Sequence, residues 1–143
     1  MMKKLLILLL SIIPIILSAQ NKYSYKDVID FRDGMLDTAR KMTKSVPIQV
    51  NEYQTLIAIG VTESLVTYKY EIAGWDSNKM MSKDELEQTK KLTSLNLARS
   101  QQYPDMFLEC LRRTKLEFQF MFFSEDRKYI GGFRLSYDDF KRK

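Results

Sequence analysis

Two segments with alternating side chains constrain the fold most, because a period of two fits a strand that buries one face. They are residues 65–72, LVTYKYEI, and residues 115–123, KLEFQFMFF. The apolar row is Val66, Tyr68, Tyr70 and Ile72 in the first segment, and Leu116, Phe118, Phe120 and Phe122 in the second. Each segment therefore predicts a strand whose apolar face packs on helices.

The other elements follow from start signals and periodicity. Ser24 with Asp27, and Ser82 with Glu85, have the spacing of capping boxes, and Pro104 suits the first position of a helix. The predicted helices are 25–43, 83–100 and 104–113, and the further strands are 55–61 and 128–137. The fold class is therefore α+β, with topology α-β-β-α-α-β-β. We expect a four-stranded antiparallel sheet in the order 1-2-3-4, with the helices packed on one face.

The N-terminal residues have the layout of a secretory signal peptide. Lys3 and Lys4 form a positive start, residues 5–17 are an apolar run of 13 residues broken by one Ser and one Pro, and Ser18 and Ala19 are small. A membrane-spanning helix needs about 20 apolar residues, so this run is too short. We predict cleavage after Ala19, with an uncleaved anchor as the alternative. The protein would be exported to the periplasm or the outside of the cell, with no stable membrane span after cleavage.

Removal of residues 1–19 leaves residues 20–143, a length that suits one small domain. This part carries 21 Lys and Arg against 18 Asp and Glu. Such a mild bias is typical of a solvated surface, and contact with an acidic partner or anionic lipid head groups is the alternative. Export and the lack of a nucleic-acid-binding motif argue against a nucleic acid partner.

The sequence lacks the residues that most enzymes and metal sites use. It has no His, the usual general base and the commonest metal ligand, and a single cysteine, Cys110. Cys110 is expected to be a buried thiol or, alternatively, to form an intermolecular disulfide. Asp138 and Asp139 are neighbours in the sequence, whereas glycosidase carboxylates face each other across a substrate. We expect no catalytic residue, metal or cofactor, with a carboxylate-based hydrolase as a remaining alternative.

From Pro47 onward the chain resembles small exported bacterial proteins of unknown function. The residues that carry the resemblance are Pro47, Asn51, Thr55-Leu56, Tyr68-Lys69-Tyr70, Phe118-Gln119-Phe120 and Asp126. The SAQ at the end of the leader also resembles exported proteins of Bacteroidetes-type bacteria. The pattern has a second cysteine near its C-terminal end, where this chain has Phe140, so its disulfide does not carry over. The resemblance implies export and an α+β layout, and it implies no activity.

The alternation also predicts a register and, from it, a binding surface. Pairing Tyr68 with Phe118 places both apolar rows on the helix side of the sheet. The opposite face then contains one apolar row, formed by Gly60, Leu65, Met121 and Ile130. An exposed apolar row rimmed by polar residues can mark an interaction site, although scattered apolar surface residues are ordinary. We therefore predict that Leu65, Met121 and Ile130 bind a partner protein or a second copy.

Two further features bear on binding. Trp75, the only tryptophan, lies in the loop AGWDSN, where it either caps the core or contacts a partner. The aromatic rows also allow a small-ligand carrier, with a cavity between helices and sheet lined by Tyr68, Phe118, Phe120 and Phe122. The leading interpretation is a small exported binding protein without catalytic activity, such as an inhibitor, an immunity factor or an accessory subunit of an envelope complex.

Overall fold

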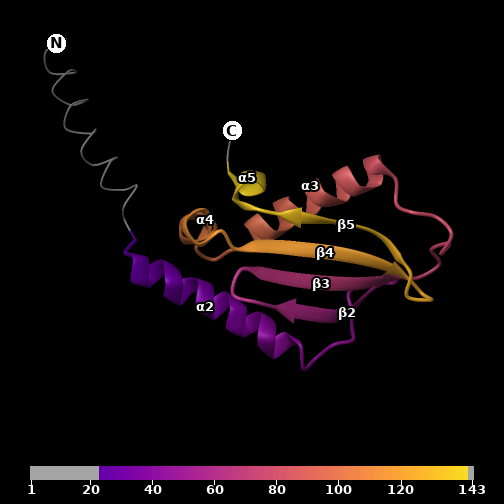
Figure 1. The fold of residues 1–143 in the computed structure, drawn as a ribbon, viewed down its shortest axis with the longest axis horizontal. Coiled ribbons are helices and arrows are strands. Elements are labelled where there is room, and N and C mark those ends of the chain that lie inside the picture. The colour runs from indigo at the N-terminus through magenta and orange to yellow at the C-terminus, as the bar shows by residue number, and fades with distance from the viewer. Residues whose placement is uncertain (1–22, 142–143) are drawn as a thin grey trace, which may run out of the picture.

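The computed structural model describes residues 23–141, which form an α+β structure around a five-stranded sheet (Figure 1). The predicted cleavage site after Ala19 lies outside these residues. In chain order the elements are α2 (Tyr25–Met42), β1 (Ile48–Gln49), β2 (Gln54–Val61), β3 (Leu65–Ile72), α3 (Lys83–Arg99), α4 (Pro104–Thr114), β4 (Glu117–Ser124), β5 (Tyr129–Leu135) and α5 (Tyr137–Phe140). The predicted helices and strands are present, and the short β1 and α5 are additional.

Reciprocal capping boxes begin the two long helices, as predicted. The Ser24 hydroxyl accepts the Asp27 N–H at 3.1 Å, and the Asp27 carboxylate accepts the Ser24 N–H at 3.3 Å. The corresponding distances for Ser82 and Glu85 are 3.1 and 2.9 Å. These bonds satisfy N–H groups that have no partner in the first turn of a helix. Pro104 is the first residue of α4, again as predicted.

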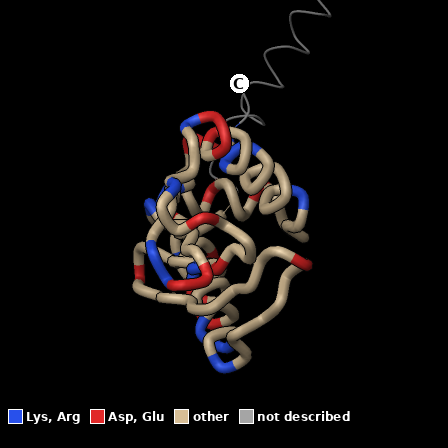
Figure 2. Tube along the Cα trace, turned by 90° about the vertical axis from the view of Figure 1, so that its right-hand side faces the viewer, with Lys and Arg blue, Asp and Glu red and all other residues tan. Residues whose placement is uncertain are grey.

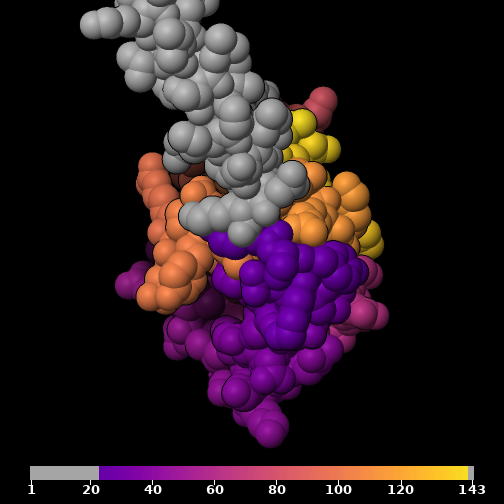
Figure 3. All heavy atoms as spheres, turned by 90° about the vertical axis from the view of Figure 1, so that its left-hand side faces the viewer, coloured from indigo at the N-terminus to yellow at the C-terminus, as the bar shows by residue number. Residues whose placement is uncertain are grey.

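The sheet corrects the predicted strand directions. The order β1-β2-β3-β4-β5 keeps the predicted neighbours, but β3 and β4 are parallel, not antiparallel. The 17 residues of α3 rise about 25 Å and the eight residues of β3 about 26 Å, so α3 alone returns the chain to the start of β3. α4 then packs beside α2 at that end of the molecule (Figure 3). The second pass along the sheet that the prediction assumed does not occur.

The pairing partners differ from the predicted ones because the direction of β4 is reversed. Tyr68 lies beside Phe120, not beside Phe118. Even-numbered residues of β3 still lie beside even-numbered residues of β4, so the apolar rows of both strands share one face of the sheet. On the outer face Arg134 lies beside Gln119 in the register, and its guanidinium is 3.5 Å from the carboxylate of Glu117.

A β-bulge removes Ile130 from the predicted apolar row. Phe122 pairs with Gly131 and Phe123 with Tyr129, so Ile130 is the extra residue on β5. A bulge interrupts the alternation of faces, and Ile130 is 0% exposed in the core. The bulge lies next to the pair Gly131-Gly132, and glycine inside a strand is typical of a bulge or a close backbone approach.

The core lies between the helices and one face of the sheet. Its buried cluster combines residues of α2 and α4 with the inward rows of the strands. Across the sheet, aromatic rings stack in sequence: the ring centroids of Tyr68 and Phe120 are 5.2 Å apart, those of Phe120 and Phe133 5.4 Å, and those of Tyr70 and Phe122 5.8 Å. Within this aromatic layer Phe120 and Phe122 of β4 are buried, whereas Tyr68 and Tyr70 of β3 and Phe133 of β5 are partly exposed.

The surface charges are mixed in sign. Figure 2 shows Lys and Arg interspersed with Asp and Glu along the chain. Exposed pairs such as Lys26 with Asp30, at 2.8 Å, contribute little to stability because solvent screens them. Among residues 23–141, no helix has both the length and the apolar character needed to cross a membrane.

Cys110 is a buried core residue, as predicted, and burial raises the pKa of its thiol. We expect iodoacetamide to label Cys110 at least about a hundredfold more slowly in the native protein than in the unfolded protein, because the reactive thiolate is both disfavoured and shielded. Intact-mass spectrometry over time measures both rates. Labelling of the native protein at the unfolded rate, or a covalent dimer without reductant, would support the intermolecular disulfide instead.

Candidate functional site

An apolar groove between α2 and α3 is the candidate functional site. Figure 1 shows α2 along β2 and α3 along β5, so the middle strands β3 and β4 form the floor between them. Two adjoining pockets of about 530 and 350 Å3 make up this groove, and they share Tyr68 and Leu97. The first is lined by Asp30, Phe31, Gly34, Met35, Thr38, Ala39, Met42, Val66, Tyr68, Leu97, Gln101, Gln102, Tyr103, Phe107 and Phe118. The second is lined by Val50, Gln54, Tyr68, Tyr70, Thr89, Thr93, Asn96, Leu97, Phe120 and Phe122.

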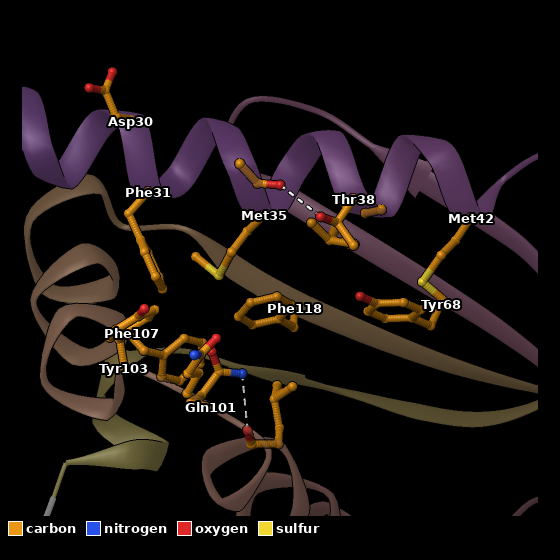
Figure 4. Close-up of a pocket in the computed structure, with 15 residues that line it drawn as sticks. Asp30, Phe31, Met35, Thr38, Met42, Tyr68, Gln101, Tyr103, Phe107 and Phe118 are labelled. Atoms are coloured by element: carbon orange, nitrogen blue, oxygen red, sulfur yellow. Dashed lines mark hydrogen bonds between the residues drawn. The ribbon is translucent and has the colours of Figure 1, made fainter.

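The helical spacing of α2 builds the apolar wall of the first pocket. Phe31, Met35 and Met42 recur at intervals of four and seven residues and therefore lie on one side of the helix. Figure 4 shows Met35 and Met42 pointing from α2 toward Phe118 and Tyr68 of the floor, and Phe31 pointing toward Phe107 and Tyr103. Methionine side chains adapt to irregular apolar surfaces, so this wall suits an apolar occupant.

Gly34 leaves the wall of α2 open between these side chains. A glycine inside a helix costs about 1 kcal/mol relative to alanine. Packing does not require it here, because a Cβ atom at Gly34 would meet nothing within 4 Å. The Thr38 hydroxyl donates to the Gly34 carbonyl at 3.0 Å, so this backbone group is satisfied within the helix. The open wall at Gly34 therefore adds room to the groove at the expense of helix stability.

Two tyrosines place hydroxyl groups in the groove. Burial raises the pKa of Tyr68, and it raises the pKa of Tyr70 to about 12, so both phenols are protonated at neutral pH. Neither hydroxyl has a hydrogen-bond partner within residues 23–141. Each can therefore donate a hydrogen bond to an occupant of the groove.

The remaining polar groups of the walls are mostly satisfied within the chain. The hydroxyls of Thr89 and Thr93 each donate at 2.7 Å to the carbonyl four residues earlier in α3. The Gln101 amide donates to the Leu97 carbonyl at 3.1 Å. Figure 4 shows Asp30 on the side of α2 away from the floor. The groove is thus largely apolar with few free polar groups, and its walls hold no facing carboxylates.

The residues predicted to bind a partner are not brought together. Leu65 lies beside Glu117, and Met121 beside Lys69, both partly exposed on the outer face of the sheet but in different rows. With Ile130 in the core, the predicted continuous apolar row does not exist. There are two structural reasons. The parallel pairing of β3 and β4 places Leu65 and Met121 in different rows, and the bulge in β5 turns Ile130 inward. A role of Leu65 and Met121 in binding stays a prediction.

Trp75 packs at the end of the core, which was one of its two predicted roles, and its role in partner binding stays a prediction. Its indole packs against the core from the loop after β3, and its N–H donates to the Lys79 carbonyl at 2.8 Å. The loop is fixed further by the Glu125 carboxylate, which accepts the Gly74 N–H at 3.0 Å. Trp75 therefore stabilises the end of the core and lies outside the residues that line the groove.

The acidic residues do not form a reactive cluster. Asp138 pairs with Lys141 at 2.9 Å, and Asp139 pairs with Lys90 at 3.3 Å and accepts the Ser136 N–H at 2.8 Å. Within the described part of the chain, no group of three His, Cys, Asp or Glu side chains could hold a metal ion. Both aspartates act locally at the C-terminal helix α5.

The alternative prediction of a small-ligand carrier, with a cavity between helices and sheet, identified part of the groove. Each of its four predicted aromatic residues lines at least one pocket: Phe118 the first, Phe120 and Phe122 the second, and Tyr68 both. Sequence reasoning missed the walls, above all Gly34, Leu97 and Tyr103. For Gly34 a signal was present, because a glycine in the middle of an otherwise regular amphipathic helix needs a reason.

Comparisons with known proteins bear on the fold. No protein-family model matches the sequence, and no curated protein matches it. A Pseudomonas aeruginosa protein described as secreted has a similar structure, with a TM-score of 0.58 and 13% identity over 83% of this chain and 99% of that one. The pilotin EpsS of the Vibrio vulnificus type 2 secretion system gives 0.51 and 10% over 82% and 99%, and the Vibrio cholerae type II secretion pilotin AspS gives 0.52 and 9% over 80% and 96%. At these identities the similarity shows that the chain shares their fold.

Proposed function

We propose that the chain is a small exported accessory protein of the bacterial envelope that binds an apolar segment of a partner protein in the groove between α2 and α3. The proposal includes export by the signal peptide, a periplasmic or extracellular location, and the lack of an enzymatic activity. The observation that carries it is the open, apolar groove over the aromatic layer, with Gly34 in its wall. The fold supports it, because a secreted protein and two secretion pilotins have similar structures.

The groove offers a driving force for binding. Burial of apolar surface contributes about 25 cal/mol per Å2, and Met35, Met42, Tyr68 and Tyr70 are partly exposed in the groove, above the buried Phe118, Phe120 and Phe122. Val50 and Tyr103 extend this surface, since both are exposed apolar residues at its margins. Contiguous exposed apolar surface of this kind marks interaction sites.

Filling the groove at Gly34 is the test of this proposal. We expect Gly34→Phe to lower the affinity for the partner at least about tenfold, because the new ring occupies the pocket. Gly34→Ala is the matched control, since it changes the same helix position and fills little of the pocket. Wild-type and variant chains are used to capture proteins from their own envelope fraction, and binding of the identified partner is then measured by calorimetry.

Two outcomes would change the conclusion. If Gly34→Phe is folded by circular dichroism and retains the same proteins as the wild type, the groove is not the binding site. If instead native mass spectrometry finds a small molecule on the wild type and on Gly34→Ala but not on Gly34→Phe, the protein is a small-ligand carrier. The carrier remains the second candidate, because about 530 Å3 lies within the usual range of about 300–1,000 Å3 for ligand pockets.

A further inference from the structure

The groove runs along the strands of its floor. The residues of β3 that line it are Val66, Tyr68 and Tyr70, which are successive inward positions of that strand. A strand rises about 3.3 Å per residue, so the Cα atoms of Val66 and Tyr70 are about 13 Å apart. An occupant of both pockets therefore lies along β3, and about five residues of an extended chain match this length.

Two hydroxyl groups on this floor need a partner when the groove is filled. The rings of Tyr68 and Tyr70 both stack on Phe120, with centroid distances of 5.2 and 6.4 Å. Neither hydroxyl has a hydrogen-bond partner within residues 23–141, and both reach solvent, because no buried side-chain oxygen in this part of the chain lacks a partner. An occupant displaces this water. A covered hydroxyl without a partner is costly, so the occupant has to offer an acceptor to each tyrosine.

An extended peptide segment along β3 offers these acceptors at the right repeat. The carbonyl groups of alternate residues point to the same side of an extended chain and are about 6.6–6.8 Å apart, which is also the separation of two alternate residues of β3. The carbonyl groups of a helix are already bonded to N–H groups of the same helix. An apolar helix would therefore cover both phenols without pairing them.

The charges around the groove select against an acidic occupant. Among the described residues that line the two pockets, only Asp30 is charged, and none is basic, although the chain has 23 Lys and Arg. The carboxylate of Asp30 pairs with Lys26 at 2.8 Å. A fatty acid or a phospholipid head group would find no cation in the groove. A peptide segment without Asp or Glu, by contrast, brings no unpaired negative charge into it.

We propose that the occupant of the groove is an extended, apolar peptide segment of a partner protein, free of acidic residues, whose backbone carbonyl groups accept hydrogen bonds from Tyr68 and Tyr70. The inference rests on the function proposed above, and it specifies the conformation and the chemistry of the bound segment. The methionines and aromatic rings of the groove contribute affinity, and the two hydroxyl groups select the conformation.

Removal of the two hydroxyl groups tests the inference and keeps both rings. The probe is a blocked peptide of alternating valine and threonine with a lysine at each end, about eight residues long so that it spans the floor. A peptide of the same length and ends, built from leucine and the helix-forming α-aminoisobutyric acid, is the comparison. We expect the mature chain to bind the extended peptide at least about tenfold more tightly than the helical one in fluorescence anisotropy titrations.

Tyr68→Phe combined with Tyr70→Phe should lower the affinity for the extended peptide about tenfold, and each single change about threefold. The single variants decide the question if the double variant does not fold. Tyr53→Phe is the matched control, because it removes the same atom from an exposed tyrosine outside the groove and should leave the affinity unchanged. Tighter binding of the helical peptide, binding of neither peptide, or unchanged affinity in the tyrosine variants would overturn the inference.

The partner captured from the envelope fraction separates a failure of this inference from a failure of the proposed function. If Gly34→Phe abolishes binding of that partner and the double tyrosine variant leaves it unchanged, the groove is the binding site but the segment does not use the two hydroxyl groups. If neither variant changes the binding, the function proposed for the groove is itself wrong. Loss of binding in both, with Tyr53→Phe unchanged, supports the inference and the proposed function together.

Discussion

Replacement of Phe107 by alanine is expected to lower the free energy of unfolding by about 3–5 kcal/mol. Phe107 is 1% exposed, and its ring centroid lies 6.2 Å from that of Phe118 and 5.2 Å from that of Phe140. One side chain thus connects α4 with β4 and with α5. Its removal takes a buried ring out of the core and leaves a cavity that the surrounding backbone cannot fully close. Urea unfolding followed by circular dichroism measures the change.

Tyr103→Ala is the matched control for this prediction. Tyr103 is an aromatic residue of the same segment, but it is 60% exposed, and its side chain does not cap α4. We expect its removal to change the free energy of unfolding by about 0.5 kcal/mol or less. Similar losses for the two variants, or a loss below about 1 kcal/mol for Phe107→Ala, would contradict the role of Phe107 as the link between these elements.

Local signals account for the part of the fold that the sequence predicts well. Side-chain alternation places β3 and β4, and it identifies their inward faces because the period of two holds whether the strands pair parallel or antiparallel. The capping boxes at Ser24 and Ser82 define where α2 and α3 begin, since they depend on residues three positions apart. These features need no knowledge of how distant segments meet.

The errors arise where distant segments meet. The direction of β4 depends on whether α4 runs back along the sheet or packs on α2, and no pattern within α4 decides this. The inward position of Ile130 depends on a bulge, which the pair Gly131-Gly132 indicates without fixing which residue is extra. The predicted apolar row required an antiparallel β4 and a β5 without a bulge. Neither condition holds, so the row does not form.

In the groove, too, local patterns predict one part and contacts between distant segments determine the other. Its floor follows from the aromatic rows, and the alternative of a cavity between helices and sheet therefore named the correct floor residues. Its walls depend on the separation of α2 and α3. Both helices lie on the same face of the sheet, α2 along β2 and α3 along β5. A separation between two helices leaves no periodic signal in either of them. Only Gly34, which has no packing neighbour to explain it, hints at the open wall in the sequence itself.

Gly132→Ala is expected to destabilise the protein by about 3 kcal/mol, through a clash rather than a cavity. Gly132 lies on the outer face of β5, and a Cβ atom there would lie 2.5 Å from the Phe120 carbonyl oxygen and 3.1 Å from the Tyr129 hydroxyl. The tyrosine tip can move aside, but the carbonyl belongs to β4, which is paired with a strand on each side. The backbone of β4 or β5 must therefore shift, and the aromatic layer on the other face must shift with it.

Gly60→Ala tests whether the clash, and not the mere addition of a methyl group to a strand, causes this loss. Gly60 lies on the same face of the sheet in β2, where the nearest atom to an added Cβ would be the Thr67 Cβ at an ordinary 3.7 Å. Alanine also restricts the unfolded chain more than glycine does, so we expect Gly60→Ala to be neutral or to stabilise the protein by up to about 1 kcal/mol. Thermal and urea unfolding should therefore show a large loss of stability for Gly132→Ala and no loss, or a small gain, for Gly60→Ala. Equal destabilisation at both positions would mean that strand geometry, rather than the approach of Gly132 to the Phe120 carbonyl, sets the requirement for glycine.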